Sequence, residues 1–137
     1  MNPIAMNAVQ AASLWTALNL IYLIILSLGV VKLRRAHRVG VGDGGVPALT
    51  GAGRAFGNAA EYVPAGLAAM AVMALAGAAA WAVHAVGALL LIGRLLHASG
   101  LTRTTGVSTG RLAGMALTYV AFAIAAVTLL LRAFAPY

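Results

Sequence analysis

The apolar stretch from Phe56 to Leu96 limits the fold of this chain more than any other feature. It is roughly twice as long as one bilayer crossing requires, so it must hold two membrane helices and a tight turn. We predict the turn at Gly77–Trp81, on the outer side, which places Trp81 at the membrane interface. The stretch therefore predicts a helical hairpin that crosses the membrane twice.

Two further apolar runs, Ala8–Val31 and Leu112–Leu131, are each long enough to cross a hydrocarbon core of about 30 Å once. Hydrophobic residues make up 63% of the 137 residues and charged residues only 8%, which leaves too little polar surface for a water-soluble globule. We therefore predict an all-α integral membrane protein, a single domain of four transmembrane helices. The expected spans are residues 8–31, 55–77, 81–98 and 111–132.

Two segments rich in glycine and other turn formers, Val39–Gly53 and Ser99–Gly110, predict the loops on one side of the membrane. All lysines and arginines except Arg132 lie in or near these loops, so the positive-inside rule makes this side cytoplasmic and leaves both termini outside. The formal charge of +7 then reflects membrane topology, and we expect no nucleic-acid partner. The chain has no cysteine and His84 has no second ligand at helical spacing, so we expect no metal site.

A stripe of polar residues lies at the start of the second span. If this segment is helical, Arg54, Asn58 and Glu61 are spaced at i, i+4 and i+7 and line one face over about 10 Å. An ionised carboxylate inside a bilayer costs on the order of 3 kcal/mol unless it is paired, so Glu61 marks a candidate functional site. The same residues can instead form an internal network that only joins neighbouring helices. Taken alone, the stripe supports both interpretations.

Further polar residues lie at the cytoplasmic ends of neighbouring spans, and we predict that they share the depth of the stripe. The full set is Arg34, Arg54, Asn58, Glu61, Tyr62, Arg94, His97 and Arg111. It predicts a cationic pocket with one carboxylate, which suits a small ligand with several carboxylates and an ammonium group. Because we find no serine–histidine–acid set or paired carboxylates, we expect the protein to supply binding and electrostatics rather than a nucleophile.

The order and spacing of four segments resemble a known family. The segments are Arg54-x-x-x-Asn58-x-x-Glu61-Tyr62-x-Pro64, Arg34-Arg35-Ala36-His37-Arg38-Val39, Gly93-Arg94-Leu95-Leu96-His97 and Arg111. The family is that of the membrane-associated proteins in eicosanoid and glutathione metabolism (MAPEG), which includes microsomal glutathione transferases and leukotriene C synthase. The resemblance covers nearly the whole chain and looks closest to bacterial branches. It implies a homotrimer in the bacterial inner membrane, with both termini periplasmic and sites between neighbouring subunits.

The resemblance also implies that glutathione is the co-substrate. The residues that would hold its carboxylates and amine are Arg34, Arg54, Asn58, Glu61 and Tyr62. Arg94 and His97 would extend this contact, and Arg111 matches the arginine beside the sulfur, where a cation favours the thiolate. Leu101 stands where several relatives have a tyrosine, and the stretch before Arg111 is longer than in the animal synthases, which leaves Arg103 as an alternative.

We therefore predict a glutathione transferase or peroxidase whose thiolate attacks a lipophilic electrophile or hydroperoxide from the membrane. Two alternatives stay open: a non-catalytic, lipid-binding member of the family, and a small four-helix multidrug transporter that uses Glu61. A transporter would require Glu61 near the bilayer midplane, whereas its spacing from Arg54 puts it about two turns from the basic edge.

Overall fold

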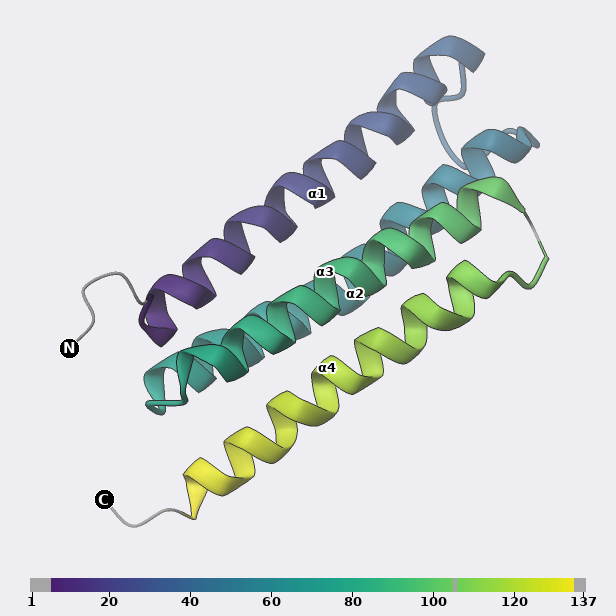
Figure 1. Cartoon of the computed structure of the whole chain (residues 1–137). Helices are drawn as coiled ribbons and strands as arrows, with labels where there is room; N and C mark the ends of the chain where they lie inside the picture. Colours follow the sequence, from purple (N-terminus) through teal and green to yellow (C-terminus); the bar gives the residue numbers. More distant parts are fainter. Residues whose placement is uncertain (1–5, 105, 135–137) are drawn as a thin grey trace.

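The computed structural model describes residues 6–104 and 106–134. Its four helices are α1 (Ala8–His37), α2 (Pro47–Leu75), α3 (Ala80–Arg103) and α4 (Thr109–Ala133). Each helix is long and apolar enough to cross a membrane (Figure 1). The predicted all-α integral membrane protein with four transmembrane helices is therefore confirmed.

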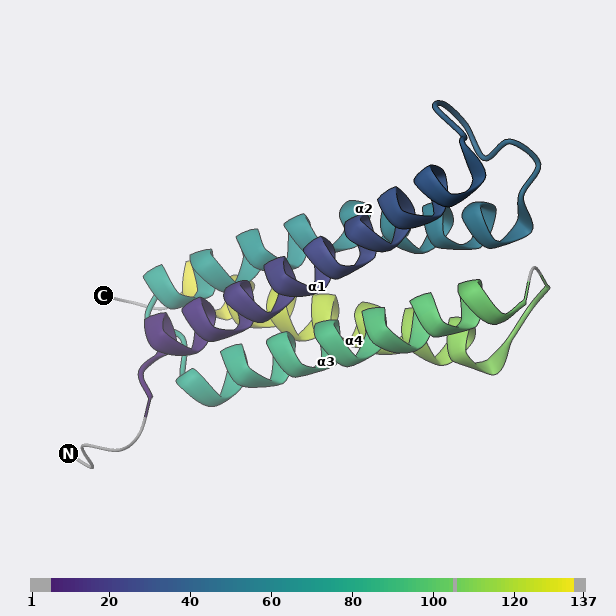
Figure 2. The same ribbon diagram turned by 90° about the horizontal axis from the view of Figure 1, so that it is seen from above.

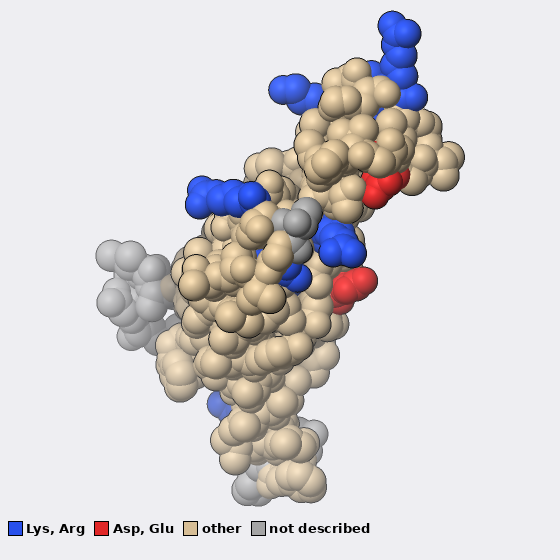
Figure 3. Space-filling model, turned by 90° about the vertical axis from the view of Figure 1, so that its right-hand side faces the viewer, with Lys and Arg blue, Asp and Glu red and all other residues tan. Residues whose placement is uncertain are grey.

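The four helices alternate in direction, so α1 and α3 end where α2 and α4 begin (Figure 1). We call this the basic end, because it carries most of the cationic side chains. These are Lys32, Arg34, Arg35, Arg38, Arg54, Arg103 and Arg111. Figure 3 shows lysine and arginine gathered on this end of the molecule. The start of α1, the end of α4 and the α2–α3 turn lie at the opposite end.

Helices α2 and α3 form the centre of the bundle, since each of them contacts all three other helices. Within the described residues no contact joins α1 to α4, and Figure 2 shows α1 and α2 on one side with α3 and α4 on the other. The larger apolar core draws on all four helices and lies away from the basic end, around Met70, Met73, Val83 and Leu90. This division leaves the basic half of the bundle available for polar contacts.

Side-chain hydrogen bonds join α1 to α3 along their shared face. Trp15 Nε1 donates to His84 Nδ1 at 3.0 Å, and the Tyr22 hydroxyl donates to the Arg94 carbonyl at 2.9 Å. Between these two bonds, the fully buried Asn19 donates from Nδ2 to the Trp15 carbonyl at 2.8 Å. His84 is thus a hydrogen-bonded residue between helices.

The turn between α2 and α3 lies where the sequence predicts it. Gly77 has φ 69°, a left-handed backbone conformation that favours glycine. Trp81 follows in the first turn of α3 and is exposed, as an interfacial aromatic should be.

The predicted loop Val39–Gly53 is wrong from Pro47 onward, because α2 begins there. Proline is a turn former in most contexts, but at the first position of a helix its fixed φ suits the helix and its missing N–H costs no bond. The real connection closes on itself: Asp43 accepts hydrogen bonds from the Gly45 amide at 3.0 Å and from the Thr50 hydroxyl at 2.7 Å.

The predicted loop from Ser99 to Gly110 is wrong in its first half, because α3 continues to Arg103. The Ser99 hydroxyl donates to the Leu96 carbonyl at 2.8 Å, and the Thr102 hydroxyl makes a similar bond one turn back. Polar side chains that bond to the preceding turn are compatible with a helix. The turn-forming composition of Ser99–Gly110 therefore led to a predicted end of α3 that is too early.

Candidate functional site

A polar pocket of about 310 Å³ opens between α2, α3 and α4 in the basic half of the bundle. It is lined by Arg54, Gly57, Asn58, Glu61, His97, Leu101 and Arg111. Five of the eight candidate residues thus share one cavity, although they come from three helices. The pocket combines two guanidinium groups, an amide, an imidazole and one carboxylate.

The stripe on α2 does not form a closed network of its own. Arg54 and Glu61 are exposed, and in residues 6–104 and 106–134 no hydrogen bond or ion pair joins them to each other or to Asn58. The alternative of an internal Arg54–Asn58–Glu61 network is therefore not what the structure has. Arg54 and Glu61 both line the pocket, and among the described residues no hydrogen bond uses their charged groups.

Arg94 lies beside the pocket and is only 1% exposed. Its Nη1 donates to Asn58 Oδ1 at 2.6 Å, and its Nε and Nη2 donate to Thr118 Oγ1 at 3.1 and 2.7 Å. Its guanidinium carbon lies 4.9 Å from the centroid of the Tyr62 ring, a cation–π distance. Neutral oxygens and an aromatic ring therefore surround this cation, and they join α3 to both α2 and α4.

The contact with Arg94 fixes how Asn58 faces the pocket. A guanidinium group only donates hydrogen bonds, so the atom of Asn58 that meets it must be the amide oxygen. The two N–H groups of Nδ2 then lie on the other branch of the amide and have no acceptor among the described side chains. Asn58 consequently offers the pocket a donor that suits a carboxylate.

His97 and Arg111 meet where α3 and α4 approach each other. His97 Nδ1 lies 3.1 Å from the Arg111 carbonyl oxygen, and because a carbonyl only accepts, Nδ1 carries the proton in this contact. In the neutral tautomer that carries this proton, Nε2 is an acceptor. The Arg111 side chain is half-buried and donates from Nη1 to the Gly106 carbonyl, which holds it at the pocket.

Glycines allow this close approach of α3 and α4. A Cβ atom on Gly114 would lie 2.5 Å from the Gly93 carbonyl oxygen and 2.6 Å from the His97 backbone nitrogen. These contacts involve backbone, which cannot move aside as a flexible side chain can. The register that brings His97 and Arg111 together thus depends on the absence of a side chain at position 114.

Arg34 lies outside this pocket in the single chain. It lines a second polar pocket, also of about 310 Å³, between the end of α1 and the start of α2, and Arg54 lines both. Arg103 lines neither of the two cavities. Of the two arginines considered for the sulfur position, Arg111 is therefore the one at the candidate pocket.

The residues of α4 that contact Arg94 and Tyr62 were not predicted from the sequence. Thr118 is fully buried against Arg94, and the rings of Tyr119 and Phe122 lie 6.4 and 6.2 Å from that of Tyr62. In the sequence, Thr118 is visible only as a hydroxyl residue within the apolar run Leu112–Leu131. Whether Thr118 faces α3 depends on how α3 and α4 pack against each other, and a single sequence does not reveal this register.

The family model described as MAPEG matches residues 12–131, a range that includes every residue of the candidate pocket. The chain belongs to the MAPEG family. The Inner membrane protein YecN of Escherichia coli (strain K12) is 42% identical over 91 residues, which are 66% of this chain and 70% of the relative. The protein of the same name from Escherichia coli O6:H1 matches equally well. Membership of this family agrees with the resemblance found in the sequence and is consistent with the four-helix fold.

Proposed function

We propose that this MAPEG protein binds glutathione in the pocket between α2, α3 and α4 and stabilises its thiolate for attack on a lipophilic substrate. The observation that carries the proposal is the convergence of Arg54, Asn58, Glu61, His97 and Arg111 on one cavity. Glutathione has two carboxylates, one ammonium group and one thiol. A pocket with several donors and one carboxylate complements this set of groups.

Four of the pocket residues and two of their neighbours have distinct parts in the proposal. Arg54 and the Nδ2 group of Asn58 would hold carboxylates, and Glu61 would take the ammonium group. Arg111 would lie beside the sulfur, where its charge lowers the pKa of the bound thiol. Arg94 would support the pocket through its hydrogen bond to Asn58, and Tyr62 would support Arg94 through the cation–π contact.

The thiolate of bound glutathione is the nucleophile in this proposal, so the protein itself supplies none. The thiol proton leaves to solvent, and the sulfur forms a bond to an electrophilic carbon, from which a leaving group departs with its electron pair. With a hydroperoxide, the sulfur takes the terminal oxygen and the alcohol leaves. A second glutathione then reduces the sulfenic acid and gives the disulfide and water.

We further propose a homotrimer in a bacterial inner membrane, with membrane lipids around it and both termini in the periplasm. The name of YecN as an inner membrane protein supports this location. Of the nine lysines and arginines, all except Arg132 lie in the basic half of the bundle. By the positive-inside rule, this distribution supports a cytoplasmic location for the basic end. Neighbouring subunits would complete the pocket walls.

The test is an ultraviolet difference titration of the detergent-solubilised protein with glutathione near neutral pH, which detects the bound thiolate. We expect a saturable signal that Arg111→Gln abolishes. Arg103→Gln removes the same charge from the basic end outside the pocket and should keep the signal. Absence of any thiolate signal from the unmodified protein contradicts thiol activation.

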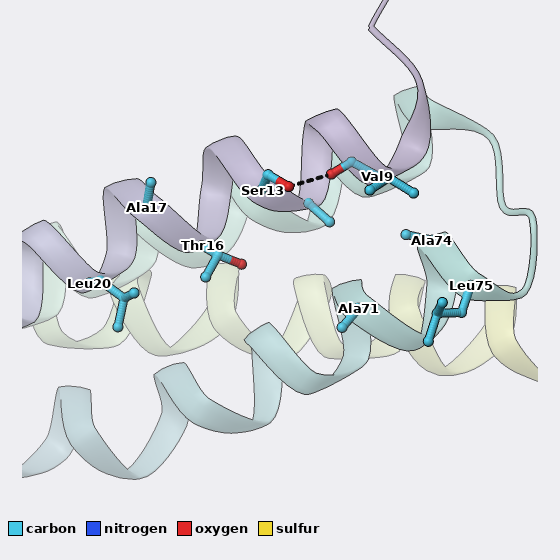
Figure 4. A pocket seen from close by; sticks show the side chains of 9 residues that line it. Val9, Ser13, Thr16, Ala17, Leu20, Ala71, Ala74 and Leu75 are labelled. Atoms are coloured by element: carbon cyan, nitrogen blue, oxygen red, sulfur yellow. Dashed lines mark hydrogen bonds between the residues drawn. The ribbon is translucent and has the colours of Figure 1, made fainter.

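A specific observation supports each of two other functions. An apolar groove of about 510 Å³ between α1 and α2, where Thr16 and Leu20 point towards α2, fits a lipid-binding protein (Figure 4). Glu61 lies at the middle of α2 and has no ion-pair partner in the described residues, which fits a multidrug transporter. Glu61→Gln separates the cases: weaker glutathione binding supports the transferase, whereas unchanged binding with loss of drug resistance in cells supports transport.

A further inference from the structure

We propose that a pocket at the end of the bundle opposite the basic end binds the phosphodiester group of a membrane phospholipid. The pocket has a volume of about 340 Å³ and lies between the start of α3 and the end of α4, which meet at this end (Figure 1). It is lined by Ala79, Trp81, Ala82, Thr128, Leu131 and Arg132. None of these residues lines either of the two polar pockets of the basic half.

The position of Arg132 along α4 places this pocket at the depth of lipid headgroups. Arg132 lies 21 positions after Arg111 on the same helix, which separates the two residues by about 32 Å at 1.5 Å per residue. The hydrocarbon core of a bilayer is about 30 Å thick. With Arg111 at one face of the membrane, Arg132 therefore reaches the phosphate layer of the other leaflet, far from the proposed glutathione site.

No acidic side chain of the protein can neutralise Arg132. The chain has only two acidic residues, Asp43 and Glu61. Asp43 lies in the loop at the basic end, and Glu61 lies 14 residues before the end of α2, about 21 Å along the helix from the end that carries the pocket. A cation at the membrane boundary is stabilised by a partner. In a bilayer, the anionic groups at this depth are lipid phosphates.

The two nitrogen-containing side chains of the pocket offer donors that suit a phospholipid. Arg132 and Trp81 are both exposed, and in residues 6–104 and 106–134 no acceptor meets the guanidinium group or the indole N–H. A guanidinium fork matches two oxygens of a phosphodiester, which only accept hydrogen bonds. The indole N–H of Trp81 is a single donor, which suits the carbonyl oxygen of an acyl ester.

The apolar part of the pocket distinguishes a phospholipid from a free phosphate ion. Ala79, Ala82 and Leu131 line it together with the ring of Trp81. A free phosphate ion gains nothing from these surfaces. A phospholipid joins its phosphate to glycerol and acyl groups, and tryptophan suits this depth because one end of its ring is apolar and the other is polar. The pocket thus combines the two kinds of surface that a phospholipid requires.

The experiment measures quenching of Trp81 fluorescence by a brominated lipid. The chain has only two tryptophans, so Trp15→Phe leaves Trp81 as the sole indole. The full-length variant in detergent is titrated with phosphatidylethanolamine brominated on its acyl chains. This lipid has no net charge, so general attraction to the +7 charge of the protein does not contribute. We expect saturable quenching, with a midpoint that Arg132→Gln raises by more than about tenfold.

Arg103→Gln is the matched control, because Arg103 is also an exposed arginine in the last turn of a membrane helix and does not line this pocket. It should leave the midpoint within about twofold. Equal midpoints for Arg132→Gln and its parent overturn the proposal. The titration is repeated with Trp15 retained, where the shift caused by Arg132→Gln should appear again, and its absence there also overturns the proposal.

Two further arms test whether the phosphate and the acyl chains are both recognised. Brominated diacylglycerol has the same acyl chains without a phosphate, so it should quench Trp81 more weakly, with a midpoint that Arg132→Gln leaves unchanged. Equal quenching by the two lipids contradicts recognition of the phosphate and indicates an unselective apolar surface. Displacement of the phospholipid by an equal concentration of inorganic phosphate contradicts a lipid site and indicates a small-anion site.

Discussion

Arg94 Nη1 on α3 donates a hydrogen bond of 2.6 Å to Asn58 Oδ1 on α2, so a buried cation holds one wall of the candidate pocket. The same guanidinium group bonds to Thr118 on α4. Three helices are thus joined at one side chain. We infer that Arg94 is a positioning residue, which affects the pocket through Asn58 and through the packing of α2 and α4.

The first prediction is that Arg94→Lys destabilises the bundle. A lysine ammonium is compact and does not reach Asn58 and Thr118 with separate branches, so at least one buried acceptor loses a charged donor. We expect a loss of about 2 kcal/mol in the free energy of unfolding, the usual value for a hydrogen bond to a charged group. Thermal unfolding in detergent, followed by circular dichroism, measures it. The exposed Arg103→Lys is the control, and equal midpoints would rule out the structural role.

A second prediction separates stability from binding at Asn58. Asn58→Asp gives Arg94 an ionic partner, so the midpoint of unfolding should stay the same or rise. The variant also removes the Nδ2 donors and adds a negative charge beside the proposed carboxylate site. Glutathione affinity should therefore fall by about tenfold or more in isothermal titration calorimetry. An unchanged affinity means that Asn58 does not contact a carboxylate.

These two residues also show how far the sequence predicts the site. The i, i+4, i+7 spacing predicts that Arg54, Asn58 and Glu61 share one helix face, and they do line one pocket. Helical periodicity is local, so one chain reveals it. The partner of Arg94 depends on the rotation and register of α3 against two other helices, and no local pattern carries that information.

The membrane-spanning helices could be predicted from the sequence more accurately than the ends of the loops between them. Membrane spans follow from length and hydropathy alone, which is why all four were predicted. Pro47 and Gly100 have two uses, in turns and in helices: Pro47 begins α2, and Gly100 lies inside α3, where a Cβ would be 2.8 Å from the Arg111 backbone nitrogen. Tertiary contacts decide between these uses, so the loops were predicted too long.

A third prediction concerns the close approach of α3 and α4. Gly114→Ala places a methyl group against the Gly93 carbonyl and the His97 backbone, so the two helices must separate. We expect the free energy of unfolding to fall by about 1–3 kcal/mol, as for other overpacked sites. Gly29→Ala in α1 is a matched control, because its Cβ would meet nothing within 4 Å. Equal thermal midpoints for the two variants would contradict close packing at Gly114.

The last prediction is a pH dependence of the loop before α2. Hydrogen bonds from Thr50 and from the Gly45 amide hold the pKa of Asp43 below its ordinary value. A lowered pKa means that these bonds stabilise the loop fully above about pH 4 and are lost as the pH falls through the lowered value. Hydrogen exchange of the Gly45 amide, corrected for its intrinsic pH dependence, should therefore accelerate only below about pH 4.

Thr50→Val gives this prediction its sharpest control. It removes the Thr50 hydroxyl, the larger cause of the shift, and leaves the Gly45 contact. The midpoint of the exchange transition should then rise towards the ordinary aspartate value, while Asp43→Asn should remove the transition altogether. A transition that keeps its midpoint in Thr50→Val would show that the hydroxyl does not hold the Asp43 carboxylate in the membrane-embedded protein.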